Sequence, residues 1–143
     1  QYIIMIMKVG ERVRKYEDSK TEFTLTVTEK SLKDIAAFVN TSGGTIYYGV
    51  DDSGKVVGLD DIDDQFTRLT NMIRDSISPD ITLFMNAEII EENNAKLIRG
   101  EVSSGAGKPY YLKSRGIRPD GVYVRQGSSS VPASVDPTQR NIS

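Results

Sequence analysis

The chain has 143 residues and a formal net charge of −2, and it contains no cysteine and no histidine. These two absences exclude disulfides, thiol nucleophiles, zinc sites of the usual kind and Ser-His-Asp hydrolysis. Any catalysis must therefore use carboxylates, lysine, arginine, tyrosine, serine or a carboxylate-held metal ion. The length suits one globular domain, and the lack of cysteine fits a reducing cytoplasm, which is the expected location.

Charge is unevenly distributed along the chain. Residues 1–28 carry +1, residues 29–94 carry −8 and residues 95–143 carry +5. A basic end on an acidic body can present a positive face to phosphates, although solvated surfaces also vary in charge without any binding role.

The first half of the chain predicts a strand, a helix and a second strand. Residues 1–15 include an apolar run too short to span a bilayer, and an N-terminal strand or extension is expected there. Residues 22–27 alternate as a strand does, whereas 30–39 place their apolar side chains on one face of a helix. The strongly apolar residues 45–50 are expected to form a central strand.

The second half predicts a longer helix and several strands. Apolar spacing places the helix over 62–77. Residues 81–90 and 95–102 are predicted to form a hairpin, and shorter strands are expected at 110–113 and 121–125.

These elements predict an α+β fold in which a mixed sheet is flanked by two main helices. The domain is expected to cover 16–134, and 135–143 to begin a C-terminal helix or a linker to a region beyond this chain. Gly43 and Gly44 are predicted to end the first helix, with at least one of them at positive φ.

Cations and aromatic side chains alternate in the last third of the chain. Cations neutralise phosphates and release counterions, while aromatic rings and guanidinium planes can stack on bases. Amphipathic strands with ordinary surface charges would give the same pattern, so both interpretations stay open. The candidate nucleic-acid-binding residues are Lys108, Tyr110, Tyr111, Lys113, Arg115, Arg118 and Arg125.

Four carboxylates are candidate metal ligands and, if the chain is a nuclease, candidate catalytic residues. Glu17 and Glu22 lie before and within the first strand, and Asp51 and Asp52 end the strand expected to be central. On neighbouring strands, three of them could hold Mg²⁺ or Mn²⁺, the only cofactors considered, and such an ion activates water without histidine. Glu22 and one aspartate are then expected to lie close together, with Glu17 nearer the rim. The simpler interpretation is that the aspartates are turn formers.

Several stretches resemble the Schlafen/AlbA family in order and spacing, from residue 16 to about 134. The most specific block includes Ala36-Ala37-Phe38-Val39-Asn40-Thr41-Ser42-Gly43-Gly44-Thr45 and continues through Gly49-Val50-Asp51-Asp52-Ser53-Gly54. Residues 16–23, the pair Pro109-Tyr110 and residues 122–128 also fit the family pattern.

This resemblance implies an α/β domain that commonly stands at the N-terminus of bacterial transcriptional regulators. In eukaryotic relatives a pair of such domains cuts structured RNA, with metal-holding carboxylates at positions that look like Glu17, Glu22 and one of Asp51 or Asp52. Thr24 departs from the family, which usually has lysine directly after Glu-Phe, and this departure argues against cleavage.

The leading expectation is therefore a nucleic-acid-binding module, for DNA rather than RNA, of a bacterial regulator. The alternatives are a metal-dependent endoribonuclease and a protein-interaction or dimerisation module. A homodimer and a C-terminal domain outside this chain are further expected partners, and no membrane partner is expected.

Overall fold

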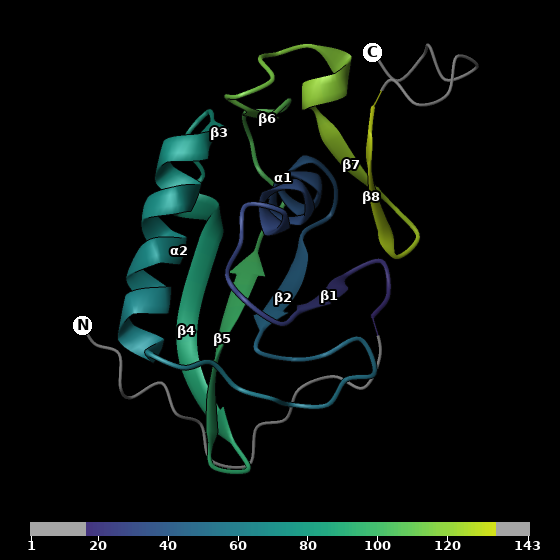
Figure 1. Ribbon diagram of the computed structural model, residues 1–143. Helices are drawn as coiled ribbons and strands as arrows, with labels where there is room; N and C mark the ends of the chain where they lie inside the picture. Colours follow the sequence, from purple (N-terminus) through teal and green to yellow (C-terminus); the bar gives the residue numbers. More distant parts are fainter. Residues whose placement is uncertain (1–16, 134–143) are drawn as a thin grey trace.

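The structure, a computed structural model, describes residues 17–133 and is built on a four-stranded sheet (Figure 1). The strands lie in the order β1 (Thr21–Thr24), β2 (Gly44–Tyr48), β5 (Ala95–Val102) and β4 (Met85–Glu92). β1 and β2 are parallel and the other neighbours are antiparallel, so the sheet is mixed, as predicted. The predicted central position of β2 is also confirmed.

The β4–β5 hairpin turns at Asn93 and Asn94, which both have positive φ (53° and 65°). This conformation matches the twist of the two strands, and asparagine tolerates it better than most residues. The predicted hairpin is confirmed, but its first strand begins later than expected. A short 3-10 helix, η2 (Thr82–Phe84), occupies the segment before Met85.

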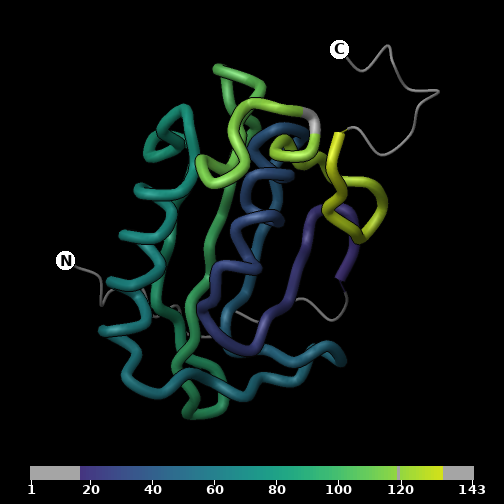
Figure 2. Tube along the Cα trace, turned by 45° about the horizontal axis from the view of Figure 1, so that its top comes forward, coloured from purple at the N-terminus to yellow at the C-terminus, as the bar shows by residue number. Residues whose placement is uncertain are grey.

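Two helices, α1 (Ser31–Asn40) and α2 (Ile62–Ser76), pack on one face of the sheet. Figure 2 shows them side by side, with the strands beneath. α1 is fully buried along its apolar side, whereas α2 buries only Leu69 and Ile73. Both helices fall close to their predicted bounds. Within residues 17–133, neither helix is long and apolar enough to cross a membrane.

Two small sheets complete the described part of the chain. β3 (Ile77–Ser78) pairs with β6 (Tyr111–Leu112), and β7 (Tyr123–Gln126) forms a hairpin with β8 (Ser129–Pro132) beside α1. The 3-10 helix η3 (Pro119–Gly121) precedes β7.

The outcomes for the remaining predicted segments differ. β3 and β8 had no expected counterpart. An isolated bridge joins Val50 and Val56 across the turn that contains Asp51 and Asp52. The predictions for 1–15 and 135–143 lie outside the described residues.

The end of α1 follows the predicted glycine geometry. Gly43 has a φ of 83°, and its N–H donates to the Phe38 carbonyl at 2.9 Å. Gly44 is needed for a different reason, because an added Cβ would lie 2.5 Å from the Phe38 ring. The two glycines thus set the sharp entry from α1 into β2.

Candidate functional site

Arg125, on β7, is the centre of a buried polar network that joins three parts of the fold. Its side chain is 3% exposed and donates from Nη2 to Glu22 Oε1 on β1 at 2.9 Å. Nη1 lies 3.5 Å from Asp34 Oδ1 on α1, and the guanidinium stands 4.8 Å from the centre of the Phe38 ring. A single guanidinium group therefore contacts two acidic side chains.

The same guanidinium also covers the open edge of β1. Nη2 donates to the Asp18 carbonyl at 2.9 Å and the Thr21 carbonyl at 3.3 Å, and Nε donates to the Ser19 carbonyl at 3.2 Å. Ser130 on β8 closes the network, because it accepts from Nη1 at 2.9 Å and donates to Asp34 at 2.6 Å. Arg125 thus holds the β7–β8 hairpin against β1 and α1. Its position does not fit the predicted role in contacting nucleic acid.

Burial raises the pKa of Glu22 to about 8, and the nearby carboxylates of Asp34 and Glu17 add to the rise. The hydrogen bond from Arg125 lowers this pKa but does not outweigh burial and the neighbouring carboxylates. Burial also raises the pKa of Asp34, against the lowering effects of Ser130 and Arg125. Near neutral pH the Glu22 carboxyl is therefore largely protonated.

Stability should fall as the pH rises from about 4.5 to about 8. Over this range Glu22 ionises in the unfolded chain before it does so in the folded protein, so the folded state retains the proton and loses relative stability. Glu22→Gln, which mimics the protonated form, should remove most of this slope. Urea unfolding measures this effect. Between pH 5 and pH 9 the free energy of unfolding of wild type should fall by on the order of 2–4 kcal/mol more than that of Glu22→Gln. If the free energy of unfolding depends on pH identically in the two proteins, the raised pKa of Glu22 in the folded state is contradicted.

The expected meeting of Glu22 with Asp51 or Asp52 stays a prediction, and the local contacts of the two segments differ. Glu22 points toward α1, whereas Val50 and Val56, on either side of the two aspartates, pack with Phe23 on the opposite face of the sheet.

The Asp51 carboxylate is engaged within its own turn. Its Oδ1 accepts from the Ser53 hydroxyl at 2.7 Å, and this bond is the main cause that lowers the Asp51 pKa. The Lys55 N–H and the Ser53 N–H, each at 2.9 Å from the same oxygen, lower it further. The turn-forming interpretation therefore accounts for Asp51.

Glu17 also has a backbone role. Its Oε2 accepts the Phe23 N–H at 3.0 Å, on the side of β1 that faces away from β2. Between residues 17 and 133, no three Asp, Glu, His or Cys side chains are grouped so that they could hold a metal ion.

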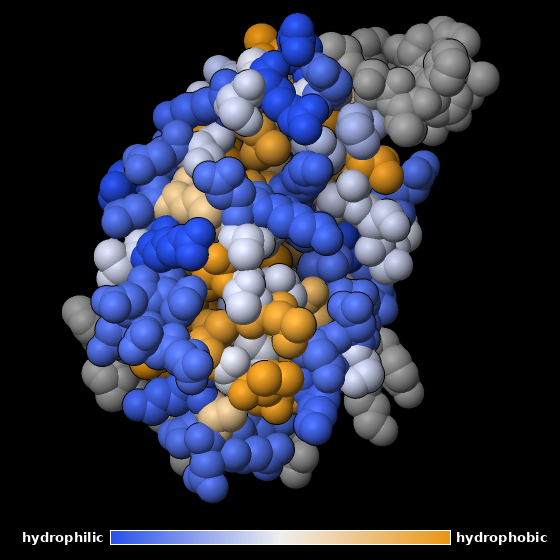
Figure 3. Space-filling model, in the orientation of Figure 1, coloured by the Kyte–Doolittle hydropathy of each residue, from blue (hydrophilic) through white to orange (hydrophobic). Residues whose placement is uncertain are grey.

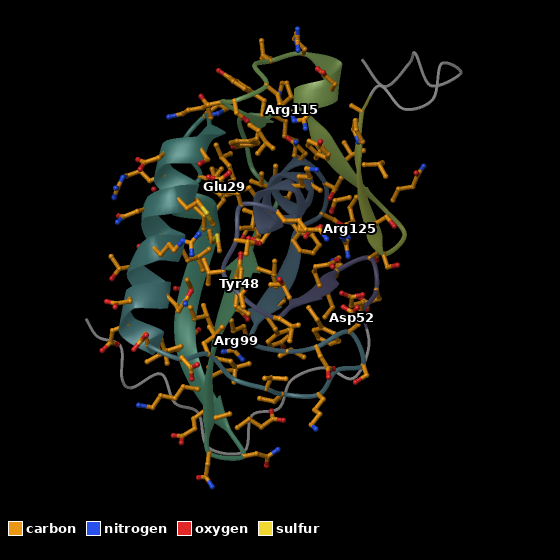
Figure 4. All side chains as sticks on the ribbon, viewed as in Figure 1. Glu29, Tyr48, Asp52, Arg99, Arg115 and Arg125 are labelled. Atoms are coloured by element: carbon orange, nitrogen blue, oxygen red, sulfur yellow. The ribbon has the colours of Figure 1, made fainter. Side chains whose placement is uncertain are left out.

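Four of the predicted nucleic-acid-binding residues lie exposed near one end of the molecule. We call Lys108, Lys113, Arg115 and Arg118 the basic end. Figure 4 shows Arg115 there, in the β6–β7 connection and well away from Asp52.

Backbone contacts fix the position of the basic end. The Lys113 N–H donates to the Ser76 carbonyl at the end of α2, at 2.8 Å. Lys108 lies near the same helix end. It directly follows Gly107, and a Cβ added to Gly107 would be 3.9 Å from Pro79, which comes just after α2. Arg118 is paired with the exposed Asp120 at 3.4 Å, a contact that solvent weakens.

The predicted aromatic partners are less accessible than these cations. Tyr110 is 1% exposed, its hydroxyl accepts the Gly107 N–H, and its backbone is held by Asn40. Tyr111 is half-buried. Tyr110 therefore belongs to the core and does not offer a stacking surface.

Acidic residues gather at the opposite end of the molecule. Four aspartates lie around the start of α2, and the Leu59 N–H ties this segment to the Lys96 carbonyl at the start of β5. These aspartates are Asp60, Asp61, Asp63 and Asp64. The start of α2 and the β6–β7 connection lie at opposite ends of the molecule (Figure 1), and Figure 3 shows hydrophilic residues at both ends.

Sequence reasoning missed Asp34, Ser130 and Asn40. Asn40 ends α1 and donates from Nδ2 to the carbonyls of Tyr110 and Tyr123, both at 2.9 Å. Its Oδ1 accepts the Tyr110 N–H at 2.7 Å. The sequence did give one indication for Asp34. Its carboxylate stands next to the apolar Ile35 in an amphipathic helix, and a carboxylate that becomes buried there needs a polar partner.

The family described as Schlafen, AlbA_2 matches residues 17–134 of the chain. Among solved structures, the DIP2311 protein from Corynebacterium diphtheriae is similar, with a TM-score of 0.62 and 20% sequence identity. The match covers 91% of this chain and 25% of that protein, so the chain spans about a quarter of its length. At this identity the likeness shows the fold alone. No curated protein matched the sequence.

Proposed function

The chain belongs to the Schlafen, AlbA_2 family, and on this premise we propose that it is a nucleic-acid-binding module that uses its basic end. The observation that carries the proposal is the gathering of four exposed cations near one end, away from the acidic start of α2. Such a surface attracts phosphates, and the distant negative charge orients the approach.

The proposed ligand is duplex DNA rather than a single strand. Single-strand binding relies on exposed aromatic rings as stacking platforms. Here Tyr110 and Tyr123 are buried, which leaves exposed cations suited to backbone phosphates. We place the module within a transcriptional regulator that has further domains, as the family resemblance implies.

Metal-dependent RNA cleavage is the second candidate, supported by the presence of Glu17 and Glu22 at the family's carboxylate positions. The local geometry gives it less support than binding. Glu22 is engaged by Arg125, and the turn with Asp51 and Asp52 is anchored on the other face of the sheet.

A direct assay separates these functions. Labelled duplex DNA, single-stranded DNA and structured RNA are titrated with the protein, with and without Mn²⁺, and scored for both mobility shift and cleavage. We expect salt-sensitive binding that is strongest for duplex DNA, with no manganese-dependent product. Cleavage that Glu22→Gln abolishes would instead establish the nuclease function, and no binding to any probe would refute the proposal.

A further inference from the structure

We propose that the free edge of β4 pairs antiparallel with β4 of a second copy of this chain, joining the two sheets into one. This inference is independent of nucleic-acid binding. It concerns an edge of eight residues whose neighbour in residues 17–133 is β5 alone.

The hydrogen-bond pattern identifies the backbone groups along this edge. The Ser103 N–H donates to the Phe84 carbonyl at 2.7 Å, so Phe84 faces β5. Because bonding direction alternates along an antiparallel strand, the N–H and C=O groups of Met85, Ala87 and Ile89 face outward. The other edge of the sheet is covered differently, since Glu17 and Arg125 bond to the outer side of β1.

The side chains at these outward positions form an incompletely covered apolar row. Met85, Ala87 and Ile89 point toward the helix face of the sheet and are half-buried. Met85 and Ala87 also line an open groove with Phe66 and Ile73 of α2. A long strand edge with an apolar border favours the addition of another strand.

One register suits a pairing between identical strands. If the two-fold axis passes between the two copies of Ala87, Met85 of each chain stands opposite Ile89 of the other. Glu88 then stands opposite Asn86, so this arrangement avoids placing two glutamates directly opposite each other. The two Ala87 residues exchange both backbone hydrogen bonds at the centre.

The charges on α2 are self-complementary in the same arrangement. Asp63 and Arg74 are exposed and eleven positions apart, close to three full turns, so they share one helix face about 16 Å apart. Arg74 borders the groove beside β4, and its 3.5 Å contact with Asp75 is a solvent-exposed pair, which contributes little. An antiparallel two-fold pairing directs Asp63 of each copy toward Arg74 of the other. This complementarity is the reason for choosing a second copy as the occupant of the edge.

The first test uses Ala87, whose N–H points away from β5. Ala87→Pro removes that donor while leaving the β4–β5 bonds, and Ala87→Val is the matched control that keeps the N–H. Sedimentation should show a dimer for wild type and Ala87→Val, and a dissociation constant at least about tenfold higher for Ala87→Pro, equivalent to about 1.4 kcal/mol. A wild-type protein that is monomeric at all concentrations, or a dimer unaffected by Ala87→Pro, overturns the proposal.

A second test avoids changes within the strand. Arg74→Glu should weaken the dimer by charge repulsion, and Asp63→Arg in the same chain should restore it. Hydrogen exchange at Met85, Ala87 and Ile89 should slow as the concentration rises. A monomer in which these amides are protected at every concentration would mean that another segment of the same chain covers the edge, which also overturns the proposal.

Discussion

Arg125→Met should lower the free energy of unfolding by about 3–5 kcal/mol, the range for removing one partner of a buried ion pair. The substitution keeps the length of the side chain but leaves Asp34 without its cation. It also uncovers the carbonyls of Asp18 and Thr21 on the outer side of β1. Urea unfolding at pH 7 measures the loss.

Arg118→Met is the matched control. Arg118 is 69% exposed and its partner Asp120 is 48% exposed, so this pair should contribute less than about 1 kcal/mol. Equal effects of the two substitutions would show that Arg125 does not hold the hairpin. Arg125→Lys should recover only part of the loss, since an ammonium group cannot contact Glu22, Asp34 and the carbonyls in the forked geometry of guanidinium.

The fold was predictable largely because its main elements repeat apolar residues with a clear period. α1 and α2 have helical spacing, and β2 and β5 are apolar over several residues. Residues 81–84 were misassigned because a 3-10 turn can bury Ile81 as a strand would. β3 has only two residues, too few to show any period.

The site was less predictable because its contacts join residues far apart in the sequence. Asp34 and Ser130 meet only after the β7–β8 hairpin folds against α1. The inward position of Arg125 did have a signal, since side chains two apart on a strand share a face and Tyr123 is buried. The course of the chain after β2 was not predictable either, because the strand ends at Tyr48 and Val50 then packs with Phe23 on the face away from the helices.

Replacing Lys113, Arg115 and Arg118 together by alanine should weaken binding to duplex DNA at least about tenfold at low salt. These side chains are exposed at the basic end, so the fold should be retained. The matched control replaces three exposed cations elsewhere, Lys55, Arg68 and Lys96, and therefore removes the same net charge. If total charge alone governs binding, the two variants will lose affinity equally.

The salt dependence of duplex DNA binding is the most direct test of the basic end as the contact surface. The slope of log K against log salt concentration reports how many phosphates are neutralised, at about 0.9 per contact. The basic-end variant should show a slope shallower than wild type by about 2–3, while the control variant keeps the wild-type slope. A wild-type slope in the basic-end variant, or an equal reduction in the control, would contradict the proposed contact surface.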